Sequence, residues 1–238
     1  GRIPIVGVCG SRGKTMVAQL VAHLLQLTGT KVGLACSKGA YLNQRLQTPG
    51  DCANWASGNR ILLNRQVEAA VFENDNRSIL NEGLAYDRCS VGIVTSLDPC
   101  DTAPECSITE PDQIYNVMRT QVDVVLPNGT AVLNADDPMV AKMAELSDGD
   151  VMYFSRYGLN EICNKHLKEQ GSVVYTENNS IVLAKGQDKQ TLINISAIPV
   201  LKSSSKTHAL ENVLAAVSAA WALNIPRDVI TAGLQTYN

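Results

Sequence analysis

The residues most able to do chemistry lie near the start of the chain, in the stretch Gly10-Ser11-Arg12-Gly13-Lys14-Thr15. They follow an apolar run over 3–8 and precede a helical pattern over 17–27, whose apolar positions share one face. Glycines in such a turn let backbone N–H groups and a helix N-terminus converge on phosphate oxygens. We therefore expect a phosphate-binding loop, with Lys14 on the outer phosphates and the Thr15 hydroxyl on Mg²⁺. The full eight-residue pattern has a glycine where this chain has Val8, so a turn that merely joins strand to helix is the alternative.

Carboxylates follow two further apolar runs. Glu73 comes directly after the run 67–72, and Asp98 and Asp101 come after the run 90–95. Open α/β sheets bind ligands at the carboxyl ends of their strands, so Glu73 is expected to be a metal ligand. A solvated, exposed glutamate is the alternative.

The elements that must position these residues alternate between strand and helix. Apolar runs near 31–35, 67–72, 90–95, 130–133 and 151–154 are separated by helical patterns, which predicts a doubly wound, mostly parallel α/β sheet with helices on both faces. Short β-rich segments between 172 and 195 predict a small antiparallel meander in the C-terminal third. The polar stretch 41–54 is expected to be either a substrate-side loop or a short hairpin on the sheet edge.

Composition narrows the class of protein. The chain has 238 residues, of which 45% are hydrophobic and 18% charged, with a net charge of -3. These values indicate a globular protein and give no electrostatic case for a nucleic-acid or anionic-membrane partner. No apolar run is long enough to cross a bilayer, so we expect a cytoplasmic protein. Seven cysteines without a C-x-x-C pair are expected to be reduced and mostly buried.

No repeat or linker divides the chain, so residues 1–238 are expected to form one domain. The chain begins with Gly1 at a predicted strand and not with Met, and we expect it to be a segment of a longer polypeptide.

Several stretches together resemble the ATP-binding central domain of the Mur ligases, and within that family most closely the module of the cyanophycin synthetases. The resemblance runs in register along the whole chain. It is carried by 1–5, Gly39-Ala40-Tyr41, 83–89, Ala131-Val132-Leu133-Asn134-Ala135-Asp136-Asp137-Pro138 and 211–216.

The resemblance implies an ATP- and Mg²⁺-dependent amide ligase. ATP would phosphorylate a carboxylate, and an amine would attack the acyl phosphate; in a cyanophycin synthetase this would join arginine to an aspartate side chain of a poly-aspartate acceptor. Lys14 and Glu73 would be catalytic, and Thr15 and Glu73 would hold the metal. The nucleotide would lie on Gly10, Ser11, Arg12, Gly13, Lys14 and Thr15, with Asn212 at the adenine edge and Asn134 and Asp137 in support. Partners would be an amino acid, a polypeptide acceptor, other domains of the parent chain and, as an open alternative, further copies of the chain.

The chain also departs from that family. Arg12 stands at a position that is normally neutral, and residues 74–78 replace the family's Thr-Ala-Arg-Gly-Gly. The segment 96–101 has no counterpart of the histidine that helps to hold a second metal, and Arg119 takes the place of an active-site lysine. Arginine cannot be deprotonated as lysine can, so that exchange is not conservative.

Two hypotheses follow. In the first, the chain is the core of a ligase with a diverged second-metal site, where Asp101 or Asp98 is a substitute ligand. In the second, it is a degenerate module retained as a scaffold. We also expect the isolated chain to form no amide bond, because in this family a further C-terminal domain closes over the nucleotide and excludes water.

Overall fold

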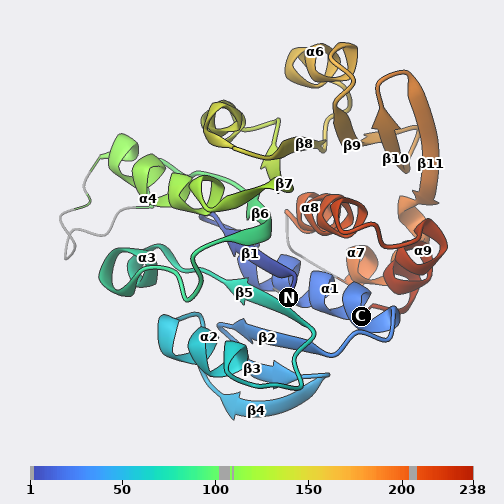
Figure 1. Cartoon of the computed structure of the whole chain (residues 1–238). Coiled ribbons are helices and arrows are strands. Elements are labelled where there is room, and N and C mark those ends of the chain that lie inside the picture. Colours follow the sequence, from blue (N-terminus) through green and yellow to red (C-terminus); the bar gives the residue numbers. More distant parts are fainter. Residues whose placement is uncertain (1–2, 102–107, 109, 204–207, 238) are drawn as a thin grey trace.

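One mixed sheet of eleven strands forms the centre of the molecule in the computed structural model (Figure 1). The structure describes residues 3–101, 108, 110–203 and 208–237. The strand order is β11-β10-β9-β8-β7-β6-β1-β5-β2-β3-β4, and every pair from β9 through β2 is parallel. The predicted α/β class with a mostly parallel sheet is therefore confirmed.

The strands are short and, in the middle of the sheet, fully buried. Their bounds are β1 Ile5–Cys9, β2 Val32–Cys36, β3 Gly39–Leu42, β4 Arg45–Pro49, β5 Ala69–Glu73, β6 Cys89–Val94, β7 Val125–Asn134, β8 Asp150–Ser155, β9 Ser172–Glu177, β10 Ser180–Lys185 and β11 Asp188–Asn194. Every residue of β1, β2 and β5 is buried. Such strands read as continuous apolar runs because helices cover both of their faces.

The helices form two layers. Helices α1 (Lys14–Leu27), α7 (Pro199–Ser203), α8 (Ala209–Ala222) and α9 (Arg227–Thr236) pack into one apolar cluster on one face. Helices α2 (Trp55–Leu62), α4 (Pro111–Asp123), α5 (Pro138–Lys142) and α6 (Glu161–Lys168) contribute to a second cluster on the other face. The remaining helical segments of the described residues are α3 (Asn76–Glu82) and the 3₁₀ turns η2 (Met143–Leu146) and η3 (Ile195–Ala197).

The polar stretch after β2 is a hairpin and not a structureless loop. Strand β3 pairs antiparallel with β2, and β4 pairs antiparallel with β3 at the edge of the sheet. The turn between β3 and β4 contains Asn43 and Gln44, both with positive φ. Of the two sequence interpretations of residues 41–54, the edge hairpin is confirmed and the long loop is wrong. The strand β4 was hard to recognise because four of its five residues are exposed and none is buried, so it lacks the alternation of a half-buried strand.

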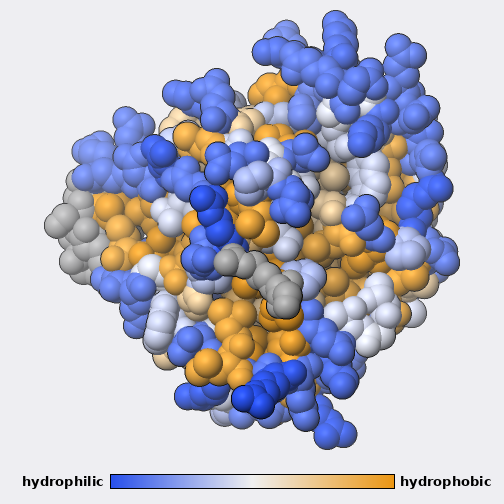
Figure 2. Space-filling view, in the orientation of Figure 1, coloured by the Kyte–Doolittle hydropathy of each residue, from blue (hydrophilic) through white to orange (hydrophobic). Residues whose placement is uncertain are grey.

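The predicted C-terminal meander is present. Strand β9 joins the parallel sheet through β8, and β10 and β11 continue it in antiparallel order. The first four residues of β11 are exposed and polar, and Figure 2 shows a mostly hydrophilic surface around α6 and the β10–β11 hairpin. Polar, charged edge strands discourage pairing with another chain.

Other expectations concern thiols and membranes. Of the cysteines in the described part of the chain, Cys100 is exposed and the other five are buried and free; Cys106 lies outside the described residues. Among the described helices, none is long and apolar enough to span a membrane.

Candidate functional site

The order of the central strands changes direction at β1. From β1 the chain continues to β2 and β5 on one side and then crosses to β6 and β7 on the other. Ligands of open α/β sheets bind at the carboxyl end of the strands where this change of direction occurs. The turn at that end of β1, residues 10–13, is the predicted phosphate loop.

The phosphate loop is shaped by two glycines. Gly10 has φ 132° and Gly13 has φ 82°. A Cβ on residue 13 would lie 1.9 Å from Asn212 Oδ1, and one on residue 10 would lie 2.2 Å from Thr95 Oγ1. Both positions therefore require glycine for conformation and for space.

The N-terminus of α1 is left open toward this edge. Its N-cap is Gly13, and no side chain among the described residues caps it. Side chains do cap α2, α3, α5 and α6, through Asn54, Asp75, Asp137 and Asn160. The first N–H groups of a helix have no partner inside it, so the uncapped end of α1 offers donors and a partial positive charge to an anion.

Two of the predicted metal ligands, Thr15 and Glu73, are in contact. Thr15 Oγ1 donates to Glu73 Oε1 at 3.0 Å, and the backbone N–H of Ser37 donates to Glu73 Oε2 at 2.8 Å. Glu73 is only 5% exposed, so the alternative of a solvated glutamate is not what the structure has. Ser37 Oγ, which sequence reasoning missed, lies 2.9 Å from Thr15 Oγ1.

Lys14 lies over the loop that precedes it. Its Nζ donates to the carbonyl of Gly10 at 2.9 Å and lies 3.8 Å from Asp75 Oδ1. Its side chain is 14% exposed. The amine is thus held at the rim of the loop, close to the open end of α1.

The segment after β6 is hydrogen-bonded to the phosphate loop at several points. The N–H of Ser11 donates to the carbonyl of Ser96 at 2.8 Å, and the N–H of Asp98 donates to Ser11 Oγ at 2.8 Å. The Thr95 hydroxyl donates to the carbonyl of Arg12 at 2.5 Å. Arg12 itself donates to Asp98 Oδ2. The pKa of Asp98 is lowered by the backbone N–H of Cys100 and by the Arg12 guanidinium.

The Asn-Ala-Asp-Asp-Pro stretch, residues 134–138, also forms hydrogen bonds with the segment after β6. Asn134 donates to the carbonyl of Thr95 at 2.9 Å, and Asp137 Oδ2 accepts the N–H of Leu97 at 2.7 Å. Asp137 also caps α5 through Oδ1. Asp136 accepts the N–H of Arg156 at 2.6 Å. In the structure, these side chains hold the carboxyl ends of β6, β7 and β8 to one another.

Asn212 lies on α8, under the phosphate loop. It is 6% exposed, and its Nδ2 is 3.5 Å from Met16 Sδ. At the start of α8, the N-cap residue His208 lies 3.2 Å from Arg12, and Glu211 in the first turn lies 3.4 Å from Arg156. Sequence reasoning did not select His208, Glu211 or Arg156, because polar residues at a helix start resemble ordinary surface positions.

Arg119 lies on the exposed face of α4, where it is paired within the helix. Its Nε donates to Asp123 Oδ2 at 3.2 Å in the last turns of α4, and it is 40% exposed. The neighbouring Gln121 is fully buried and accepts from Asn74 at 2.7 Å and from Tyr86 at 2.8 Å. Burial raises the pKa of the Tyr86 phenol. Gln121 therefore supports the end of β5, a role that no sequence pattern indicated.

The donor set at Thr15 and Glu73 fits Mg²⁺. A hydroxyl and a carboxylate are hard oxygen ligands, which Mg²⁺ prefers while keeping several waters. Two buried polar atoms, Asn76 Oδ1 at the start of α3 and Ser96 Oγ in the segment after β6, have no hydrogen-bond partner among the described residues. Buried polar atoms are usually satisfied, so their state is consistent with a polar ligand at this edge. Asp101, the other candidate ligand, accepts from Asn76 Nδ2 at 3.2 Å.

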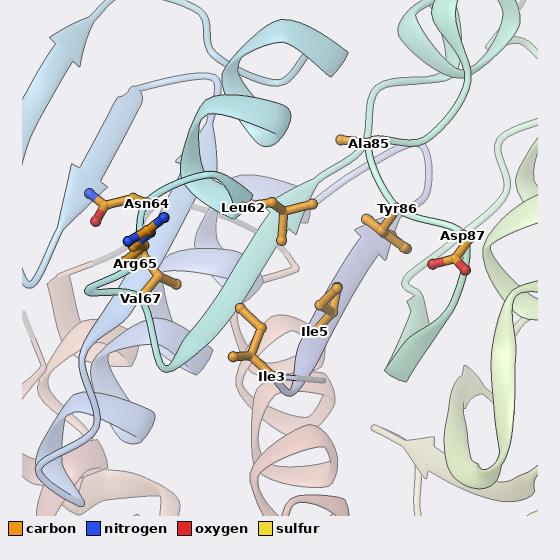
Figure 3. Close-up of a pocket in the computed structure, with 9 residues that line it drawn as sticks. All are labelled: Ile3, Ile5, Leu62, Asn64, Arg65, Val67, Ala85, Tyr86 and Asp87. Atoms are coloured by element: carbon orange, nitrogen blue, oxygen red, sulfur yellow. The ribbon is translucent and has the colours of Figure 1, made fainter. Parts of the chain in front are cut away.

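No group of three or more metal-ligating histidines, cysteines or carboxylates is found in the part of the chain that the structure describes. A cavity of about 590 Å³ lies elsewhere, at the amino end of β1 and β5 (Figure 3). Its lining residues are Ile3, Ile5, Leu62, Asn64, Arg65, Val67, Ala85, Tyr86 and Asp87. This cavity is larger than the space beside Glu73, whose volume is about 10 Å³, but none of the predicted site residues lines it.

Comparison with known proteins agrees with this geometry. The profile of the Mur ligase middle domain matches residues 8–220. The chain belongs to the Mur ligase middle domains. Proteins of this family are ATP-dependent ligases, and their domains use ATP and Mg²⁺.

Two cyanophycin synthetases are among the most similar curated proteins. The one from Crocosphaera subtropica is 36% identical over 99% of this chain and 27% of its own length. The one from Nostoc sp. is 34% identical over 100% of this chain and 26% of its own length. The chain thus spans about a quarter of these relatives.

Solved structures support the fold. The UDP-N-acetylmuramoylalanyl-D-glutamyl-2,6-diaminopimelate--D-alanyl-D-alanyl ligase from Acinetobacter baumannii matches with a TM-score of 0.65. The match covers 99% of this chain and 46% of the other, at 17% identity. This likeness concerns the fold alone.

Proposed function

We propose that this chain is the ATP-binding core of an amide ligase in which ATP phosphorylates a carboxylate and an amine then attacks the acyl phosphate. The observation that carries the proposal is the pairing of Thr15 with the buried Glu73 directly beside the uncapped N-terminus of α1. That arrangement offers oxygen ligands for a cation and backbone donors for phosphates at one place.

Each candidate residue has a role in this proposal. Lys14 contacts the outer phosphates, and Thr15 and Glu73 hold Mg²⁺, which would neutralise phosphate charge. Asp101 is a further candidate ligand. The loop residues Gly10, Ser11, Arg12 and Gly13 surround the phosphates, while Asn212 lies toward the adenine. Asn134 and Asp137 support the nucleotide indirectly, because they hold the segment after β6 in place.

Positioning and charge account for most of the catalysis in such a step. A phosphoryl group passes to an acceptor oxygen with little covalent participation by the protein. The chain's contribution is therefore to hold the phosphates on fixed donors and to keep Lys14 at the rim of the loop. The fixed contacts of residues 11, 12 and 14 with their neighbours provide that preorganisation.

The finer proposal concerns substrates. Identity of 36% to a cyanophycin synthetase favours arginine as the amine and an aspartate side chain of a polypeptide as the acceptor. We propose further that the chain acts as one domain, residues 1–238, of a longer protein, because the relatives are about four times as long. Contacts with other domains, and with further copies of the chain, belong to that proposal.

A second candidate function is a scaffold that does not catalyse ligation. It is favoured by the residue at position 119, where the resemblance expects a lysine and this chain has an arginine that is paired with Asp123. It is also favoured by the lack of a three-ligand metal cluster in the described residues.

Thermal unfolding with and without Mg²⁺-ATP separates the two functions. A ligand that binds only the folded state raises Tm, by an amount that grows with its concentration. We expect a rise for the wild-type chain, no rise for Lys14→Ala, and a full rise for Lys142→Ala, an exposed lysine on α5. No rise with the wild-type chain at millimolar nucleotide would favour the scaffold.

A further inference from the structure

The side chain of Arg12 connects the phosphate loop to two neighbouring segments. One guanidinium nitrogen donates to Asp98 Oδ2, and the other, Nη1, lies 3.2 Å from His208 Nε2. Yet the side chain is 53% exposed. Arg12 is therefore held at a defined place while it remains accessible to a ligand on the loop.

The proton positions on His208 follow from these contacts. A guanidinium only donates, so His208 Nε2 must accept from Arg12. His208 Nδ1 then carries the proton and donates to Glu211 Oε2 at 2.9 Å. Glu211 Oε1 in turn lies 3.4 Å from Arg156 Nη1 at the end of β8. This chain of contacts fixes the direction of the Arg12 side chain from the α8 side.

A second chain of contacts leads from Asp98 around the open end of α1 to Lys14. The N–H of Asp101 donates to the carbonyl of Asp98 at 2.9 Å, and Asp101 accepts from Asn76. The residue before Asn76 is Asp75, which lies 3.8 Å from Lys14 Nζ. Arg12 and Lys14 are thus the two cationic ends of one polar arc around the site where phosphates are proposed to bind.

We propose that Arg12 is a catalytic residue that neutralises charge on the phosphoryl group during its transfer. This inference rests on the proposed function. In the step, a carboxylate oxygen of the acceptor forms a bond to the γ-phosphorus, the bond from that phosphorus to the β,γ-bridging oxygen breaks, and ADP leaves with the electron pair. No proton or electron is exchanged, so the chain need only stabilise the charge on the transferred oxygens.

Arginine is suited to that task. It is always charged and donates two parallel hydrogen bonds to phosphate oxygens, and an arginine supplied within the same chain stabilises phosphoryl transfer in other phosphate-loop proteins. The contact of Arg12 with Asp98 does not prevent Arg12 from binding a phosphate oxygen. Exposed ion pairs contribute little stability, so exchanging Asp98 for a phosphate oxygen costs the protein little.

The test compares two ligands in the presence of Mg²⁺: ADP, and ADP with aluminium fluoride, which imitates the phosphoryl group in transfer. For Arg12→Gln we expect the affinity for ADP to stay within about threefold of wild type. The affinity for ADP with aluminium fluoride should fall by about a hundredfold or more, as expected for loss of an arginine that acts on the transition state. Isothermal titration gives both constants.

Three variants complete the experiment. Arg65→Gln removes an exposed arginine that precedes β5, at the amino ends of the strands, and both affinities should match wild type. Arg12→Lys keeps a charge but not the paired donors, so it should recover only part of the loss, and it serves if Arg12→Gln does not fold. Lys14→Ala should weaken binding of both ligands.

The outcomes separate the inference from the proposed function. If wild type binds neither ligand, the proposed function is wrong and the inference with it. If wild type binds both and Arg12→Gln loses them equally, or loses neither, Arg12 does not act on the transferred group and only the inference is overturned. A selective loss of ADP with aluminium fluoride supports it.

Discussion

On the β5 side of the phosphate loop the polar side chains are buried or partly buried and bonded to one another, whereas on the β6 side they are charged and more open to water. The β5 side consists of Thr15, Ser37 and Glu73, the last of which is 5% exposed. The β6 side consists of Arg12, Asp98 and His208, whose side chains are 53%, 27% and 38% exposed.

This difference shows how a site can keep one half while the other changes. A buried carboxylate must keep its partners, because an unsatisfied buried charge is costly. An exposed ion pair contributes little and can be exchanged without loss of the fold. Two departures from the Mur ligase pattern, Arg12 and the segment 96–101, lie on the β6 side. On the β5 side residues 74–78 also depart from it, but Thr15 and Glu73 are kept.

The largest expected effect is at the hinge between the two sides, in Gly13→Ala. Three atoms of the Asn212 amide lie within 3.0 Å of the new Cβ, and the residue has φ 82°. Overpacking and the left-handed backbone together should lower the free energy of unfolding by roughly 3 kcal/mol and abolish stabilisation by nucleotide. Urea denaturation measures the first and thermal unfolding the second.

Gly29→Ala is the matched control for that prediction. Gly29 has φ 86°, but nothing lies within 4 Å of its Cβ position. It should show only the backbone cost, about 1 kcal/mol. Equal losses in the two variants would mean that Asn212 does not constrain the loop.

Cysteine reactivity gives the next largest contrast. Cys36 ends β2 on the β5 side and is buried, while Cys100 follows β6 and is exposed. Burial raises the pKa of the Cys36 thiol. Because alkylation requires an accessible thiolate, Cys100 should react with iodoacetamide at least about a hundredfold faster near neutral pH.

Mass spectrometry of the two peptides over time measures this ratio. In strong denaturant the two rates should become similar, which controls for intrinsic reactivity. Similar rates in the native protein would show instead that the β5 side opens readily and is no better protected from solvent than the β6 side.

A smaller effect is expected for Glu73→Gln. The amide keeps one acceptor oxygen for the Thr15 hydroxyl or the Ser37 N–H but loses the charge that would hold Mg²⁺. The affinity for ATP in the presence of Mg²⁺ should fall about tenfold or more, while the affinity in EDTA changes little. Glu68→Gln, an exposed carboxylate before β5, is the control. An equal fall with and without Mg²⁺ would assign Glu73 a structural role only.

Much of the β5 side could be predicted from the sequence. Continuous apolar runs identify buried parallel strands, and a carboxylate at the end of such a run must lie at the carboxyl edge of the sheet. Glu73 and Thr15 meet there because β1 and β5 are adjacent and parallel, with Val8 opposite Glu73. Local patterns were sufficient because the strands have little freedom in how they pair.

The β6 side could not be predicted in the same way. Arg12 and His208 are 196 positions apart in the chain, and their contact depends on how α8 packs over the sheet. No periodic pattern encodes that distance. The edge hairpin β3–β4 was also ambiguous, because polar residues on an exposed strand resemble a loop. Helix α3 was missed for a similar reason, since Asn76 and Arg77 do not suggest a helix start until Asp75 is seen to cap it.

The smallest effect is expected for Asp98→Asn, which removes the carboxylate of the exposed Arg12 pair. Tm should fall by about 1 to 3 °C, and the difference from wild type should shrink in 1 M salt because exposed ion pairs are screened.

The pKa of Asp98 is lowered in the folded state, first by the Cys100 N–H and then by Arg12, from an ordinary value of 3.8. A lowered pKa means that the carboxylate stabilises the fold fully above that ordinary value and that the stabilisation is lost as the pH falls through the lower, folded-state pKa. The gap between wild type and Asp98→Asn should therefore be constant near pH 6 and narrow below pH 3.8. Asp148→Asn, which breaks the exposed pair with Arg88, should behave alike in salt. A drop for Asp98→Asn much larger than for Asp148→Asn, and insensitive to salt, would mean that the β6 side is as rigid as the β5 side.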